Sequence, residues 1–291
     1  MPSLKEVRNR ITSVSSTSQI TSAMKMVSAA KLRRAQDAVT QMRPYANKLR
    51  EILENLSASL DSSEGVYSRN REVKKLLVIV ITSNRGLCGG FNTSVIKKVT
   101  ADIRSNYANA QVSFLAIGKK GNDFFRRSKY TEAFPEMNNL NELFDGMNYA
   151  KTAPVAERVM KSFADGEFDK VVLYYNQFKN AAVQVTQAEQ FLPVVPTKGA
   201  TKNAKADYFF EPKKEEILLD LIPRSLKTQL YKGLLDSFAS EHGARMTAMH
   251  KATDNAKELL KNLRITYNKA RQTAITNEIL EIVGGAEALK G

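Results

Sequence analysis

The chain carries two long stripes of apolar residues at helical spacing, one near each end. In the first stripe the apolar positions alternate between steps of four and three residues, which is the spacing of a heptad seam. They are Ala35, Val39, Met42, Ala46, Leu49, Leu53, Leu56 and Leu60. A helix of about 55 residues at ~1.5 Å per residue would reach roughly 80 Å, more than twice the diameter of a small domain. A helix of that length cannot be contained in one globule.

The upstream part of this first stripe is less regular. The same steps pass through polar positions, and the phase of the stripe then shifts. The residues concerned are Leu4, Val7, Ile11, Val14, Ser18 and Thr21, followed after the shift by Met24 and Val27. We therefore expect the seam to be softer near the N-terminus than further along the helix.

The second stripe closes the chain and also follows steps of three and four residues. It consists of Met246, Met249, Thr253, Ala256, Leu260, Leu263, Tyr267, Ala270 and Ala274. We expect Pro223 to bound this helix upstream, because proline is tolerated in a first helical turn and disruptive further in. Downstream we expect the helix to fray near Gly284 and Gly285. Long helices at both ends of one chain predict that the two ends pair into a shaft.

Between the two stripes the pattern changes to short apolar runs that alternate with helical segments. Uninterrupted apolar runs of this length are typical of the buried strands of a parallel sheet. The expected strands lie at 75–83, 112–118 and 169–178, and the expected helices at 93–106 and 154–168, with Pro154 near the first position of the latter. The middle of the chain is therefore predicted to be an α/β domain.

Two further extended runs, at 189–195 and 207–212, flank a polar and basic stretch without periodicity, which we expect to be a loop or hairpin tip. The predicted organisation is an N-terminal helix over 1–60, a Rossmann-like α/β domain over 61–212 and a C-terminal helix over 213–291. One α/β domain and a helical shaft together account for the length of the chain.

Charge is distributed unevenly along the chain. The formal net charge is +14, and residues 1–50 hold ten lysines or arginines against only Glu6 and Asp37. Such a basic segment favours an acidic protein partner, nucleic acid or an anionic surface.

Continuous apolar runs of membrane-spanning length are missing from the sequence. Cys88 is the single cysteine, so an intrachain disulfide is excluded, which fits a reducing compartment.

Motifs that carry chemistry are scarce. Residues 83–92, SNRGLCGGFN, form a glycine-rich turn between a predicted strand and a helix, a place where α/β folds bind phosphates. However, the spacing matches neither GxGxxG nor a Walker motif, which favours a structural turn over a nucleotide site. A nucleophilic Cys88 would need a nearby base, and the two histidines, His242 and His250, lie on the C-terminal helix at a spacing that also disfavours a metal site.

Glu241 and His242 could form an acid and base pair, but a solvated helix face explains both residues better. We therefore expect no catalytic residues, no metal and no bound cofactor.

Four segments together carry a resemblance to a known family. They are ITSAMKMVSAAKLRRAQ at 20–36, RGLCGGFN at 85–92, ASEHGARMTAMHKATDNAKELL at 239–260 and YNKARQTAITNEILEIVGGAEAL at 267–289. In sequence and in order they are similar to the gamma subunits of F-type ATP synthases, the central rotor shafts of these enzymes. The resemblance implies an antiparallel coiled coil of the two terminal helices, with the α/β domain forming a foot and no active site of its own.

The resemblance also implies roles for individual residues. Met24 matches a position that couples rotation to catalysis, and Arg271, Gln272, Thr276 and Glu278 match positions that couple to the beta subunits. Ordinary seam packing for Met24 and a solvated helix face for Arg271 and Glu278 are the alternatives.

Two further groups of positions follow from the same resemblance. The apolar end of the chain is similar to a tip that turns in a hydrophobic sleeve, and it consists of Ile279, Ile282, Val283 and Leu289. Tyr208 and Glu211 match foot positions near the rotor ring, although Ala206 stands where many relatives have an aromatic residue.

The partners implied by the resemblance are the alpha and beta subunits of the catalytic hexamer, the epsilon subunit and the membrane ring of c subunits. Nucleic acid and a small-molecule substrate are not among them, and the expected location is the cytoplasmic face of a bacterial inner membrane. Two rival classes of protein remain. A nucleic-acid-binding coiled coil is disfavoured because Tyr45 is the only aromatic residue among the first fifty. A dinucleotide-dependent enzyme is disfavoured because the GxGxxG fingerprint is missing.

Overall fold

The structure is a computed structural model that describes residues 3–57, 66–137, 140–194 and 214–288, with the side chains at 47, 50, 53–57 and 214–219 outside the description. Its contacts divide the chain into two units. One unit joins the residues up to Ser28 to those from Met246 onward, and the other spans Ala29–Arg245. Both boundaries fall inside long helices, α1 (Leu4–Ser57) and α5 (Lys214–Ala288).

The larger unit is built on a five-stranded sheet in the order β3-β2-β1-β4-β5. The strands β1, β2, β3 and β4 are parallel, and β5 runs antiparallel to β4 at one edge. The strands are β1 (Lys75–Ile81), β2 (Gln111–Ile117), β3 (Thr131–Glu132), β4 (Lys170–Phe178) and β5 (Gln184–Leu192). The mixed sheet confirms the predicted α/β class. The extended run expected at 207–212 lies outside the described residues.

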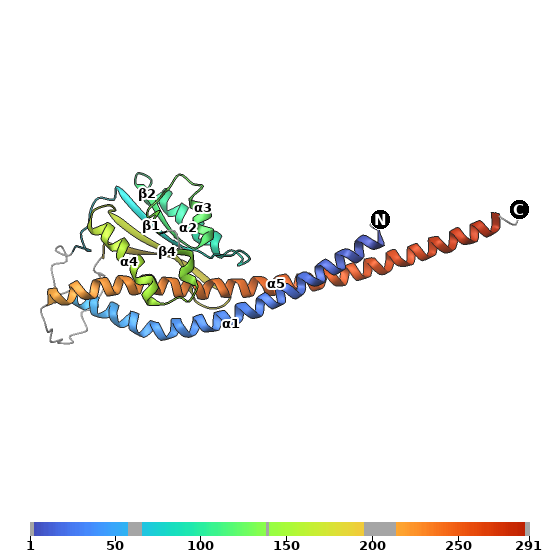
Figure 1. Cartoon of the computed structure of the whole chain (residues 1–291), viewed down its shortest axis with the longest axis horizontal. Helices are drawn as coiled ribbons and strands as arrows, with labels where there is room; N and C mark the ends of the chain where they lie inside the picture. Colours follow the sequence, from blue (N-terminus) through green and yellow to red (C-terminus); the bar gives the residue numbers. More distant parts are fainter. Residues whose placement is uncertain (1–2, 58–65, 138–139, 195–213, 289–291) are drawn as a thin grey trace. The chain divides into compact units, whose positions relative to one another are not determined.

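Helices cover both faces of the sheet (Figure 1), which explains why its central strands are apolar without alternation. On one face, Leu76, Val78 and Val80 of β1 pack with buried residues of α2 (Phe91–Asn106) and α3 (Lys119–Phe125). On the other, Leu77, Ile79 and Ile81 pack with α4 (Tyr149–Ala164) and α5 (Lys214–Ala288). A short 3-10 helix, η1 (Leu140–Phe144), adds Leu140 and Leu143 to this second core.

The segment of α5 in this unit packs its apolar face on the sheet. Leu226, Leu230 and Leu234 are at most 2 % exposed and belong to the same core as β1 and α4. Their steps of four residues place them on one side of the helix. Since a buried leucine stabilises a fold by about 1.5–3 kcal/mol, these contacts fix the helix to the domain.

Two predicted helix boundaries are wrong, and in both cases a proline lies inside the helix. Pro223 does not bound α5, which begins at Lys214, and Pro154 lies well inside α4, which begins at Tyr149. The cap of α4 is Asn148, whose side chain accepts a hydrogen bond of 2.8 Å from the Lys151 amide. An interior proline costs helix stability, and packing of the flanking turns on the sheet outweighs that cost.

Helix α5 also runs past its expected fraying point, because it continues through Gly284 and Gly285 to Ala288. Helix α1 runs over Leu4–Ser57 with Pro44 inside it. Each glycine costs a helix about 1 kcal/mol relative to alanine, which is too little to end a helix as long as α5.

Candidate functional site

The smaller unit is a pair of antiparallel helices, which we call the terminal helix pair: residues 4–28 of α1 and 246–288 of α5. Thr253 donates a hydrogen bond of 2.8 Å from its hydroxyl to the hydroxyl of Thr21. Arg8 donates one of 2.8 Å to the Tyr267 hydroxyl, and its guanidinium lies 5.8 Å from the centre of the tyrosine ring. This hydrogen bond from Arg8 lowers the pKa of Tyr267. The two contacts set a register that the heptad pattern did not provide.

Two predicted seam positions in this unit are wrong, because Val27 and Ala274 are both exposed. Val27 is 58 % exposed, whereas its neighbour Ser28 is 2 % exposed and donates a hydrogen bond of 2.7 Å to the carbonyl oxygen of Met24. Ser28 can be buried because its hydroxyl is satisfied by its own helix. The seam therefore runs through small polar residues here, with Thr21 also buried at 9 % exposure.

The predicted coupling residues lie on both helices of the pair. Met24 is half-buried on α1, whereas Arg271, Gln272, Thr276 and Glu278 are all exposed on α5. Thr276 donates its hydroxyl to the carbonyl oxygen of Gln272 at 2.9 Å, as a helical threonine commonly does. The four α5 residues follow one another within about two helical turns. The structure thus groups these four and leaves Met24 apart, near the Thr21 contact.

The described end of α5 has no packing partner among the described residues. Arg8 contacts Tyr267 only four residues after α1 begins, so α5 extends beyond the start of α1, as Figure 1 shows for this unit. Every described residue from 271 to 288 is exposed. The large apolar side chains among them are Ile275, Ile279, Leu280, Ile282 and Val283, between 48 % and 66 % exposed. Such a group of exposed apolar side chains marks an interaction surface.

Three predicted site residues lie outside the described residues. They are Tyr208 and Glu211 of the expected foot contact and Leu289 of the expected tip.

In the larger unit, the glycine turn at 83–92 is held to α5 by Arg245, which also forms a buried ion pair within the helix. Arg245 contacts Glu241 at 2.6 Å, with side chains only 8 % and 10 % exposed. The same guanidinium donates hydrogen bonds of 2.9 Å and 3.3 Å to the carbonyl oxygens of Arg85 and Gly86. The turn also needs two left-handed residues, Leu87 at φ 64° and Gly89 at φ 58°. Arg245 therefore donates to two carbonyl oxygens of the turn, of which that of Arg85 also accepts a hydrogen bond of 2.7 Å from the Ser83 hydroxyl.

The solvated helix face expected for Glu241 and His242 is wrong, since both residues are buried, at 8 % and 5 % exposure. Burial raises the pKa of Glu241 against the pull of Arg245. Burial, with Arg245 and Lys31 nearby, lowers the pKa of His242 to about 3. His242 is therefore neutral at pH 7, and its ring packs edge-on against Phe238 at 4.5 Å between ring centres.

Sequence reasoning did not single out Arg245, although it follows Glu241 by four residues, the spacing of a helical ion pair. This spacing is equally common on solvated faces, so it could not reveal the burial. Arg245 is a positioning residue for the glycine turn.

Cys88 lies inside the glycine turn and is 2 % exposed. Its sulfur lies 3.3 Å from Asn92 Nδ2, which donates to it, and 3.6 Å from Ser83 Oγ. Neither histidine is among these partners, so the arrangement provides no base for a nucleophilic thiol. Cys88 packs with Phe91 and Ala244 and acts as a small core residue.

Nowhere among the residues that the structure describes do three or more metal-ligating side chains come together. Among the helices described, none combines the length and the apolarity needed to cross a bilayer.

Comparison with known proteins identifies the family. A family model described as ATP synthase matches residues 3–289. The gamma chains of ATP synthase from Flavobacterium psychrophilum and Flavobacterium johnsoniae are 62 % and 61 % identical, each over the whole of both chains. The chain therefore belongs to the ATP synthase family. Within that family its relatives are gamma chains, and its fold is that of the gamma subunit.

Solved structures agree with this assignment. A chain from the central stalk and c-ring structure of Tetrahymena thermophila mitochondrial ATP synthase is 27 % identical, with a TM-score of 0.56 over 80 % of this chain and 99 % of that one. A chain of the Euglena gracilis mitochondrial enzyme is 20 % identical, with a TM-score of 0.66 over 98 % of this chain and 94 % of that one. The second likeness shows the fold alone. The predicted family and fold are thus confirmed.

Proposed function

We propose that this chain has no active site of its own and acts as the rotor shaft that couples ion-driven rotation to catalysis at the beta subunits. The supporting observation is the asymmetry of the terminal helix pair. Its two helices come from different parts of one chain and carry different side chains, so the pair presents a different surface at each angle. A shaft of this kind can hold three identical catalytic partners in three different conformations.

The proposed partners are the alpha and beta subunits at the terminal helix pair, and the epsilon subunit and c-ring at the α/β domain. Two features of the described residues support the first contact. The end of α5 is exposed and apolar, and α1 carries the exposed cations Lys5, Arg8 and Arg10. Apolar side chains fit a low-friction sleeve, and the cations suit acidic segments of a partner. We place the assembled protein at the cytoplasmic face of a bacterial inner membrane.

The test is direct observation of rotation. The full-length chain is reconstituted with alpha and beta subunits, and a bead is attached through an engineered cysteine. Because Cys88 is buried, it is replaced by serine, and the exposed Lys97 on α2 is replaced by cysteine. We expect stepwise rotation in one direction under ATP. A hexamer that hydrolyses ATP while this chain neither joins it nor turns would contradict the proposal.

Adding a positive charge at Met24 should impair coupling. We expect Met24→Lys to retain ATP hydrolysis in the reconstituted membrane enzyme but to pump several-fold fewer ions per ATP, because a lysine at this half-buried position must reach out of the seam toward the partner. The measurement is ion uptake into vesicles per ATP hydrolysed. Met26→Lys is the matched control, since Met26 is 65 % exposed and accepts the same charge without leaving a seam. Unchanged pumping per ATP in Met24→Lys would defeat this role.

A further inference from the structure

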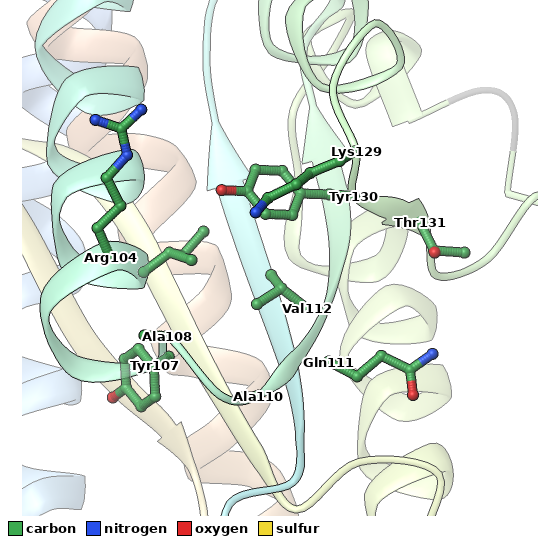
Figure 2. A pocket seen from close by; sticks show the side chains of 10 residues that line it. Arg104, Tyr107, Ala108, Ala110, Gln111, Val112, Lys129, Tyr130 and Thr131 are labelled. Atoms are coloured by element: carbon green, nitrogen blue, oxygen red, sulfur yellow. The ribbon is translucent and has the colours of Figure 1, made fainter.

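A hollow of about 550 Å³ opens at the end of the sheet where α2 stops and β2 begins. Its floor includes the buried side chains Ile103 and Val112. Six polar side chains surround it, and Figure 2 shows how they lie. They are Arg104, Tyr107, Gln111, Lys129, Tyr130 and Thr131. The volume falls in the range of small-molecule sites, about 300–1,000 Å³.

The lining is positively charged. It holds Arg104 and Lys129 and no carboxylate. The two nearest acids in the sequence are already paired, Asp102 with Lys98 at 2.9 Å and Glu132 with Arg126 at 3.2 Å. The two cations of the hollow therefore keep their charge free for an incoming anion.

The polar side chains of the lining are also unused inside the protein. Within the part of the chain that the structure describes, no side-chain nitrogen or oxygen of the six makes a hydrogen bond or an ion pair. The rings are nonetheless fixed, because Tyr130 packs against Phe125 at 6.2 Å and Lys170 lies 5.4 Å from the centre of the Tyr107 ring. The hollow thus combines ordered aromatic walls with available donors.

A simpler role for Arg104 is to offset the dipole at the end of α2, where it lies in the last turn. Figure 2 argues against this role, since the guanidinium extends back along the helix, away from Tyr107 and the helix end. A helix side chain naturally leans this way, toward the N-terminus. Arg104 is therefore placed to meet a ligand and not the terminal carbonyls.

We propose that this hollow binds a phosphomonoester carried on an apolar or aromatic body. Arg104 and Lys129 hold the phosphate, because a guanidinium and an ammonium supply charge-assisted donors to its oxygens. Gln111, Thr131 and the tyrosine hydroxyls are neutral donors at the rim, and Ile103 and Val112 receive the apolar body. The same chemistry occurs in soluble aryl phosphates and in the headgroup of phosphatidic acid. This site is separate from the coupling surfaces proposed above and does not depend on them.

The first arm of the test is calorimetric titration of the full-length chain with phenyl phosphate at low salt. We expect saturable binding, weakened about five-fold by Arg104→Gln or by Lys129→Gln and about twenty-fold or more by both. Lys97→Gln is the matched control, because it removes one exposed cation of α2 outside the hollow, and we expect less than a two-fold change. Binding that is equal in the double variant and the wild type would overturn the proposal.

The second arm identifies the source of the phosphate. Sedimentation of the chain with phosphatidylcholine vesicles is compared with and without phosphatidic acid. Retention that needs phosphatidic acid and is lost in the double variant supports a lipid headgroup, and binding of phenyl phosphate without vesicle retention supports a soluble ligand. Failure of both probes to bind the wild type overturns the proposal.

Discussion

Replacing Arg245 with methionine should destabilise the larger unit by about 3–5 kcal/mol, because the substitution leaves the buried carboxylate of Glu241 without its partner. The carbonyl oxygen of Gly86 also loses the Arg245 donor, whereas that of Arg85 keeps the hydroxyl of Ser83. The measurement is the free energy of unfolding in urea at pH 7.5, followed by circular dichroism. We also expect the variant to regain stability as the pH falls, since the raised pKa of Glu241 means that the protonated acid is favoured in the folded state.

The matched control lies on the same helix. Arg224 pairs with Asp220 at 2.9 Å with the same spacing of four residues, but both side chains are about 60 % exposed. Arg224→Met should therefore cost less than about 1 kcal/mol. The double variant Glu241→Gln with Arg245→Met should recover part of the loss, because it removes the unpaired charge. Equal costs for the two arginine variants would show that the buried pair is not what holds the turn.

The α/β class was predictable because a strand that is buried on both faces does not alternate between apolar and polar residues. The run at 75–83 reads as continuous apolar sequence, and β1 shows why: residues on opposite faces enter two different cores. The turn after it was also visible, since Gly89 and its neighbours follow a buried strand. These features depend on local sequence, which a single chain displays directly.

Helix ends and side-chain exposure were less predictable because they depend on distant contacts. Pro223 is a strong local signal for a boundary, yet the leucines that follow it pack on the sheet and the helix continues past it. Val27 fits the heptad spacing better than Ser28, yet Ser28 is the buried residue. Glu241 is charged and is buried all the same, because a partner four residues away neutralises it.

The predicted coupling residues follow from family resemblance, which periodicity could not replace. Arg271 and Glu278 are exposed in the isolated chain, so only the surface of a partner can give them a role. Their coupling function and the division of the chain at 60 and 212 stay predictions.

A second large effect concerns the dependence of stability on pH, because the pKa values of two buried groups of α5 are shifted in opposite directions. Burial raises the pKa of Asp236 to about 6 against the pull of Lys232 and Arg43, with Glu189 adding to the rise. Among the described residues its Oδ1 has no hydrogen-bond partner, although the backbone of Phe178 hydrogen-bonds to the carboxyl group and opposes the rise in pKa. The side chain borders a water-sized cavity of about 20 Å³ beside Arg43 and Lys232. Folding therefore favours the protonated acid, and the stability that this preference contributes is present below about pH 4 and lost as the pH rises through 6.

His242 behaves in the opposite way. Its pKa in the folded chain is about 3, well below the usual value of about 6.5, so folding favours the neutral ring. The stability from this preference is present above about pH 6.5 and lost as the pH falls toward 3. As the pH falls through about 5, the stability contributed by Asp236 increases by about 1 kcal/mol per pH unit, and the stability contributed by His242 decreases by nearly the same amount. Their combined effect on the unfolding free energy of the wild-type chain should therefore be small there.

Variants should separate the two contributions. Asp236→Asn removes the cost of an ionised buried acid, so the difference in unfolding free energy between variant and wild type should increase by about 3 kcal/mol from pH 4 to pH 8. His242→Phe keeps a ring against Phe238 and removes the titration, so its difference from the wild type should increase by about 3 kcal/mol from pH 7.5 to pH 4. Urea unfolding at half-unit pH intervals measures both, with Asp220→Asn as the exposed control. The two differences should run in opposite directions along the pH axis, and a difference that does not change with pH would show that the group concerned is solvated in the folded chain.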